Sequence, residues 1–164
     1  MMKFSPLFWP IQLKSNTIYI LDETQLPQKL TYIKAKNYQQ ACQAIKQMKT
    51  RAVGQVLLVM YTFILSKRQN KNLAKVAAAI NATRPTLSFK FLTDMALGME
   101  KSSAPLEKSV LGFLEVLKAK RIHADALTIN GKTMGENVKR AKVADADVIK
   151  SYGKPMKKQA GFKV

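Results

Sequence analysis

Apolar residues near the amino terminus alternate with polar ones, which is the pattern of a half-buried β-strand. Two polar breaks, Ser15-Asn16 and residues 22–27, interrupt the alternation and predict turns. The apolar positions of this region are Ile11, Leu13, Ile18, Ile20 and Tyr32. The sequence therefore predicts two or three short antiparallel strands, a β-meander within residues 8–35.

After Asn37 the apolar residues begin to recur every three or four positions, as in Ala41, Ala44, Ile45 and Met48. This spacing is typical of a helix with one buried face, and Asn37 is a suitable N-cap. Four further helices are expected over residues 53–66, 73–80, 86–98 and 106–122. The loops between them have lengths that suit neighbouring helices in a bundle.

We therefore expect an α+β protein in which a small antiparallel β-meander precedes a bundle of about five helices, residues 37–122. Both parts belong to an amino-terminal domain, residues 1–122, and residues 123–164 form a separate tail. The end of this tail is basic, contains Pro and Gly, and offers few apolar residues for packing. We expect it to be poorly ordered.

The chain has 164 residues, 47% of them apolar, which is enough for one ordinary domain with a core. Its 28 Lys and Arg residues against 10 Asp and Glu give a formal net charge of +18. Such a charge attracts nucleic acid, anionic lipid and phosphorylated metabolites without choosing among them. The single cysteine, Cys42, excludes a disulfide framework and a cysteine-rich metal site. We interpret Cys42 as a small apolar residue of a helix face, not as a reactive thiol.

Residues 1–10 do not have the pattern of a secretory signal, because Pro6 and Pro10 interrupt the apolar positions. The apolar stretch 53–65 is shorter than the roughly 20 residues that cross a bilayer. We expect a cytoplasmic protein with no membrane partner.

Two segments combine an arginine with the start of a predicted helix. In the first, Arg51 and Gly54 stand at the beginning of the apolar helix 53–66, where free backbone N–H groups and the helix dipole favour an anion. In the second, Thr83 or Arg84 lies at the cap and Pro85 fixes the first helical position. From spacing alone, ordinary exposed loop arginines explain both segments better than an anion site does, because most exposed arginines bind nothing in particular.

Three segments, residues 20–27, 44–51 and 83–86, follow one another in an order and spacing that resemble the S-methyl-5-thioribose-1-phosphate isomerase family. The resemblance covers about residues 8–121. It extends more loosely to ribose-1,5-bisphosphate isomerase and to the regulatory subunits of the translation-initiation guanine-exchange factor. It implies that Arg51 and Arg84 hold the phosphate of a sugar, with Gly54 and Thr83 beside them. Gly54 alone stands where the family has a glycine-rich run, which changes the backbone at the phosphate.

The family's aldose-to-ketose conversion uses a cysteine and an aspartate of a carboxy-terminal domain, and neither has a counterpart in this sequence. The resemblance therefore implies a truncated or fused isomerase-like protein of methionine salvage. We expect no catalytic residue, no metal and no cofactor. Such a chain would be inactive alone and would bind a phosphorylated sugar weakly.

The last forty residues, about 124–164, resemble an internal fragment of the dihydroxy-acid and sugar-acid dehydratase family. The iron–sulfur cluster and magnesium of those enzymes are not carried over, because this stretch has no cysteine. A competing alignment keeps the isomerase pattern to about residue 135, with His123 and Asp125 in a helix that leads to a catalytic domain. We favour a fusion or a rearranged reading frame with its junction near residues 120–127, and both interpretations stay open.

Two further features of this region do not predict a site. Gly131-Lys132-Thr133 lacks the glycine that a nucleotide-binding P-loop places five residues earlier, because that position is Ala126. His123 has no second histidine in the chain, so we interpret it as a solvated residue at a helix end.

The alternative functions are non-enzymatic. One is a regulatory or interaction module related to the exchange-factor subunits. The other is a basic protein that binds nucleic acid only non-specifically, since its lysines are scattered and no zinc finger or aromatic RNA-binding motif interleaves with them. We also expect self-association, or a partner chain, through an exposed face of the domain.

Overall fold

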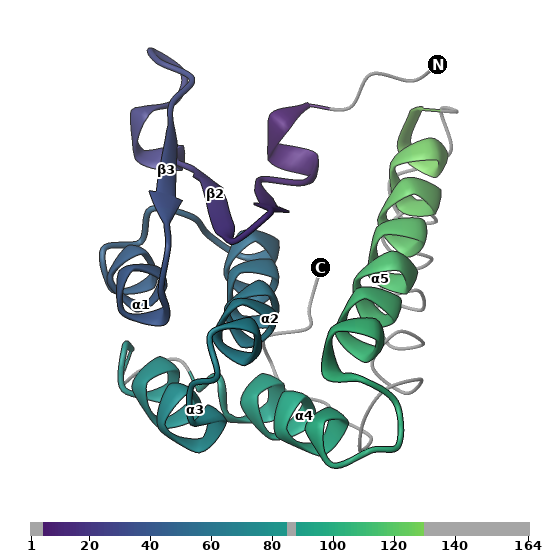
Figure 1. Cartoon of the computed structure of the whole chain (residues 1–164). Coiled ribbons are helices and arrows are strands. Elements are labelled where there is room, and N and C mark those ends of the chain that lie inside the picture. The colour runs from purple at the N-terminus through teal and green to yellow at the C-terminus, as the bar shows by residue number, and fades with distance from the viewer. Residues whose placement is uncertain (1–4, 85–87, 130–164) are drawn as a thin grey trace. The chain divides into compact units, whose positions relative to one another are not determined.

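The computed structural model describes residues 5–84 and 88–129 and divides the chain into two compact units, Met1–Val110 and Leu111–Val164 (Figure 1). Three strands come first and five α-helices follow, which confirms the predicted α+β class. The strands are β1 (Ile11–Lys14), β2 (Thr17–Leu21) and β3 (Tyr32–Ala35). The helices are α1 (Tyr38–Lys46), α2 (Val53–Arg68), α3 (Leu73–Asn81), α4 (Lys90–Glu100) and α5 (Leu106–Ile129). Short 3-10 turns occupy Pro6–Phe8 and Glu23–Gln25.

The three strands form an antiparallel sheet in the order β1-β2-β3, which is the predicted meander. Ile11 pairs with Ile20 on one side of β2, and Ile20 pairs with Ile33 on the other. Ile18 and Ile20 are fully buried, while Tyr19 between them is not. This alternation places one face of the sheet against α1 and α2 and leaves the other face outward.

Two helices begin where an asparagine can accept a hydrogen bond from their first turn. The side chain of Asn37 accepts from the backbone N–H of Gln40 at 2.9 Å, as predicted for the N-cap of α1. Asn72 accepts from the N–H of Lys75 at 3.1 Å in the same way at α3. Each cap satisfies one N–H group that the helix leaves free and typically stabilises it by about 1 kcal/mol.

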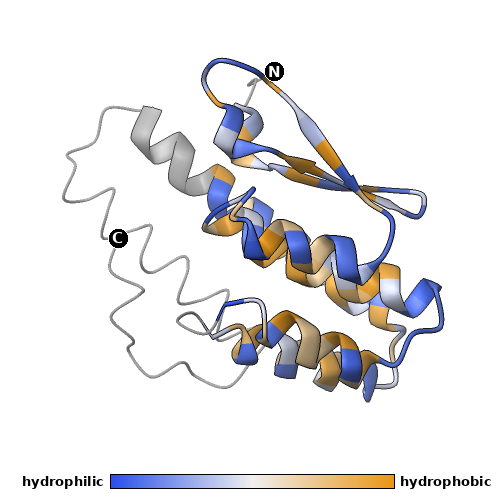
Figure 2. Cartoon of the chain, turned by 90° about the vertical axis from the view of Figure 1, so that its left-hand side faces the viewer, coloured by the Kyte–Doolittle hydropathy of each residue, from blue (hydrophilic) through white to orange (hydrophobic). Residues whose placement is uncertain are grey.

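The core of the first unit is built around α2, which contacts β1, β2, α1, α3 and α4. Its residues 57–60 and 63–65 have no measurable exposure, so the middle of α2 is buried on every side and not only on one face. Figure 2 shows apolar residues along the strands and helices and hydrophilic residues in the connecting loops. Truncation of a fully buried residue such as Phe63 to alanine would cost about 3–5 kcal/mol.

The predicted start of the fourth helix is wrong. The sequence placed it at residue 86 with Pro85 in the first turn, whereas α4 begins at Lys90 and residues 88 and 89 are not helical. Phe89 is buried at this point, and Ser88 accepts a hydrogen bond from the N–H of Lys90 at 3.2 Å. Burial of Phe89 therefore sets the beginning of the helix, and Pro85 itself lies outside the described residues.

The fifth helix is longer than predicted, because α5 continues without a break to Ile129. The proposed division at residues 122 and 123 stays a prediction, and most of the dehydratase-like stretch, including Gly131 to Thr133 and the basic tail end, lies outside the described residues. In the described part of the chain, no helix is both long enough and apolar enough for a membrane span.

Candidate functional site

Two loops that are 27 residues apart in the sequence are joined directly before α2. The backbone N–H of Glu23 donates to the carbonyl of Lys49 at 2.8 Å. The Glu23 carboxylate accepts from the Thr50 hydroxyl at 2.8 Å and from the backbone N–H of Arg51 at 3.2 Å. The first two segments of the family resemblance, residues 20–27 and 44–51, therefore meet at the amino-terminal end of α2.

Asp22 adds an ion pair to this junction. Its buried carboxylate accepts from the backbone N–H and the hydroxyl of Thr24, and lies 3.2 Å from the ammonium nitrogen of Lys49. Burial raises the pKa of Asp22, but the hydrogen bonds from Thr24 and Lys49 outweigh burial, and the pKa lies below its ordinary value. The junction is thus held by a carboxylate that is charged at neutral pH.

The first turn of α2 is unusual because its N-cap, Ala52, has a positive φ of 45° and provides no side-chain hydrogen bond. Gly54 N–H and Gln55 N–H donate to the carbonyls of Arg51 and Ala52. Among the described residues, nothing accepts from the N–H groups of Ala52 and Val53. The helix therefore begins with free donors and the positive end of its dipole, next to Arg51.

Arg51 is exposed, and no described residue makes a hydrogen bond or an ion pair with its guanidinium group. Its backbone N–H, however, is occupied by Glu23. Arg51 would therefore act on an anion with its side chain and not with its own N–H.

Arg84 lies against the same end of α2, although it is 33 residues further along the chain than Arg51. Its guanidinium donates to the Gln55 side-chain oxygen at 3.4 Å. Gln55 is only 3% exposed, and its side-chain nitrogen, Nε2, is buried without a hydrogen-bond partner in the described structure. Because Nε2 and Oε1 belong to one amide group, an unsatisfied donor lies beside the guanidinium of Arg84.

Thr83 and Gly54 have structural partners of their own. The Thr83 hydroxyl donates to the carbonyl of Ile80 at 2.6 Å and so closes the last turn of α3. A β-carbon on Gly54 would lie 1.8 Å from the Thr50 hydroxyl oxygen, so this glycine allows the close approach of Thr50. Their predicted part in phosphate binding stays a prediction.

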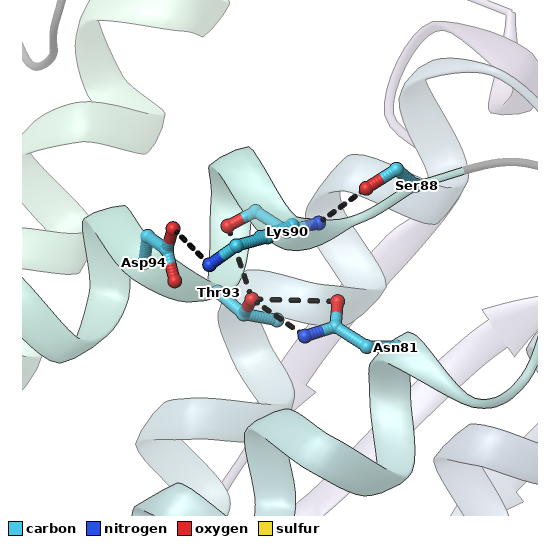
Figure 3. Close-up of polar contacts among 5 residues, drawn as sticks. All are labelled: Asn81, Ser88, Lys90, Thr93 and Asp94. Carbon is cyan, nitrogen blue, oxygen red and sulfur yellow. Dashed lines mark hydrogen bonds and ion pairs between the residues drawn. The ribbon is translucent and has the colours of Figure 1, made fainter.

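The loop that carries Arg84 is held at both ends by the hydrogen bonds drawn in Figure 3. Asn81, the last residue of α3, donates from Nδ2 to the hydroxyl of Thr93 at 3.1 Å, and Thr93 is fully buried in α4. The Thr93 hydroxyl also lies 3.1 Å from the carbonyl of Lys90, and Lys90 pairs with Asp94 at 2.8 Å. This network ties the end of α3 to the first turn of α4.

Arg51 and Arg84 were predicted from the sequence as phosphate contacts, and that role stays a prediction. The sequence did not predict the residues around them, namely Asp22, Glu23, Thr50, Gln55, Asn81 and Thr93. Gln55 gave a partial signal, because it is one of the few polar residues within the apolar helix, together with Thr62 and Ser66. The others make contacts over 12 to 28 residues, and no local pattern reveals such pairs.

The chain is similar in sequence to parts of two kinds of enzyme. It is 33% identical over 88 residues to methylthioribose-1-phosphate isomerase of Carboxydothermus hydrogenoformans, which covers 49% of this chain and 24% of that protein. A protein of Methanothermobacter thermautotrophicus, provisionally named a methylthioribose-1-phosphate isomerase, is 23% identical over 129 residues. This match covers 76% of this chain and 40% of that protein. Dihydroxy-acid dehydratase of Caldanaerobacter subterraneus is 46% identical over 50 residues, 30% of this chain and 9% of that enzyme.

This chain therefore spans less than half the length of these relatives. Both predicted resemblances, to the isomerases and to a fragment of the dehydratases, are confirmed as similarities. No family model matches the chain, and no solved structure matches it.

Proposed function

We propose that the amino-terminal end of α2 binds the phosphate group of a phosphorylated sugar, with Arg51 and Arg84 as its charged contacts. The methylthioribose-1-phosphate isomerase relatives support a sugar 1-phosphate as the substrate class. The formal charge of +18 favours any anionic ligand over a neutral one.

The observation that carries the proposal is the buried, unpartnered Nε2 of Gln55 beside Arg84. A buried donor without an acceptor costs about 1–3 kcal/mol, and native proteins rarely keep one without a reason. A ligand oxygen at this point would accept from Nε2 and would pair with the guanidinium of Arg84. The free N–H groups of Ala52 and Val53 lie at the same end of the helix and offer further donors.

This chain by itself is proposed to bind its ligand without turning it over. Its single cysteine, Cys42, lies on α1, and burial raises the pKa of the thiol to about 11. Such a thiol is protonated at neutral pH and is neither a nucleophile nor a base there. Self-association and a cytoplasmic location stay predictions.

The test is calorimetric titration of the purified chain with 5-methylthioribose 1-phosphate, with 5-methylthioribose as the ligand that lacks phosphate. Binding that requires the phosphate and is lost in Arg51→Ala plus Arg84→Ala is expected. Lys75→Ala plus Lys101→Ala removes the same charge from two exposed positions and serves as the matched control. If both double variants lose the same affinity for the sugar phosphate, binding is due to general charge attraction and not to the proposed site.

Gln55→Leu makes the test sharper, because it separates binding from folding. Leucine removes an unsatisfied buried amide, so the free energy of unfolding should stay the same or rise. Affinity for the sugar phosphate should nevertheless fall by about tenfold, which corresponds to the loss of one hydrogen bond to a charged group. Unchanged affinity in this variant would refute the proposed site. An isomerase assay on the same protein tests the second part, and turnover would contradict it.

A further inference from the structure

The outward face of the sheet carries an aromatic ring between lysines. In the sheet, Tyr19 of β2 pairs with Gln12 of β1 on one side and with Lys34 of β3 on the other, so these three residues lie in one row across the strands. Since side chains alternate along a strand and Ile18 and Ile20 face inward, this row belongs to the outward face. Lys14 lies on the same face, two residues after Gln12.

Both lysines approach the ring of Tyr19. The ammonium nitrogen of Lys14 and that of Lys34 each lie 5.7 Å from the ring centroid. We name the group of Gln12, Lys14, Tyr19 and Lys34 the Tyr19 platform. Its two lysines come from the two strands that flank β2, so the ring has positive charge contributed from both neighbours.

The described strands contribute no acidic side chain to this surface. The three strands contain no Asp or Glu, and the nearest acids along the chain, Asp22 and Glu23, are already paired with Lys49 and with Thr50 and Arg51. The platform is therefore positive and aromatic without local neutralisation. It shares no residue with the proposed sugar-phosphate site.

We propose that the Tyr19 platform binds single-stranded nucleic acid. An unpaired base has an exposed ring face that can stack on Tyr19, while Lys14 and Lys34 exchange their contacts with the ring for contacts with the flanking phosphates. A sheet with an aromatic residue on its open face and basic residues around it suits this mode of binding. A duplex hides its ring faces, so it has access to the charge of the platform but not to the stacking.

The experiment measures the fluorescence anisotropy of a labelled single-stranded 12-mer of thymidine with the full chain, and of a 12-base-pair duplex for comparison. Tighter binding of the single strand is expected. Tyr19→Leu should weaken single-strand binding by about fivefold or more, and Tyr19→Phe, which keeps the ring, should restore most of it. Circular dichroism of each variant shows that the sheet and helices are retained.

The lysines are tested through the dependence on salt. For the single strand, log affinity falls as log salt concentration rises. Lys14→Ala plus Lys34→Ala should make this slope less steep by about 1.4. Lys75→Ala plus Lys101→Ala is the control with equal charge loss, and it should leave the effect of Tyr19→Leu intact. The proposal is overturned if Tyr19→Leu binds as well as the parent. It is also overturned if the duplex binds as tightly as the single strand. Phosphatidylserine vesicles are a further probe, and the proposal is overturned if binding to the vesicles depends on Tyr19 and binding to the single strand does not.

Discussion

The hydroxyl of Thr50 fills the space into which a side chain on residue 54 would project, so only glycine fits at position 54 beside Thr50. A β-carbon on Gly54 would lie 1.8 Å from Thr50 Oγ1 and 3.1 Å from Pro10 Cγ. Thr50 is fully buried, and the same hydroxyl donates to Glu23. The glycine therefore lets the junction of the two loops close directly against the first turn of α2.

Gly54→Ala should destabilise the protein by about 1–3 kcal/mol. The methyl group forces Thr50 to move, and the buried hydrogen bond to Glu23 is then stretched or lost. Urea unfolding measures the change in the free energy of unfolding. In a Thr50→Ala background the same substitution should cost less, since the clashing hydroxyl is gone. Equal costs in the two backgrounds would show that Thr50 is not the cause.

Asp22→Asn should lower stability at neutral pH and flatten its dependence on acid. Because the pKa of native Asp22 lies below its ordinary value, its charge stabilises the fold above about pH 4. That stability is lost as the pH falls through the native pKa. The asparagine variant lacks this loss, and at pH 7 it should be less stable by about 1–3 kcal/mol.

Urea unfolding between pH 2.5 and 7 measures both effects, and Asp94→Asn is the control. Asp94 is exposed and pairs with Lys90 on the surface of α4, so its loss should cost well under about 1 kcal/mol. A pH profile of Asp22→Asn that is parallel to the parent profile would show that Asp22 makes no such contribution.

Cys42 should react very slowly with iodoacetamide in the folded protein. With a pKa of about 11, roughly one thiol in a thousand is ionised at pH 8, against about a quarter of the thiols for an ordinary cysteine. The rate should therefore be on the order of a hundredfold lower than in urea, and should rise steeply towards pH 11. Mass spectrometry follows the reaction, and equal rates in buffer and urea would contradict the prediction.

Thr93→Val should destabilise the protein by about 1–2 kcal/mol, because it removes the hydroxyl that joins α3 to α4 and leaves the side chain of Asn81 without that partner. Thr62→Val is a matched control, since Thr62 is equally buried but donates only to the Leu58 carbonyl of its own helix. Thermal unfolding compares the two variants. Similar losses would mean that the link between the helices contributes nothing specific.

The local elements of the first unit were predictable because their signals are local. Alternation identified the strands, and Asn37 marked the start of α1 as its observed cap. The start of α4 failed for an instructive reason. Pro85 is a good first helical residue by propensity, but the buried position of Phe89 decided where the helix begins. Tertiary packing overrode a local preference.

The candidate sites were predictable only in part. Arg51 and Arg84 could be named from the sequence, but the contact of Arg84 with Gln55 joins residues 29 positions apart. The grouping of Lys14, Tyr19 and Lys34 was invisible for the same reason. No aromatic RNA-binding motif interleaves with the lysines along the chain, whereas Lys14, Tyr19 and Lys34 lie together through the register of the sheet.

The enclosure of α2 has a consequence for how the first unit opens. The middle of α2, residues 57–65, is buried on every side, so its backbone cannot be exposed by fraying of the helix ends or by the departure of one neighbour. Its central amide protons should therefore exchange with deuterium only when the whole unit unfolds, whereas those of α1 should exchange through smaller openings. The exchange rate at residues 57–65 is thus a direct reading of global stability, obtained under native conditions and without denaturant.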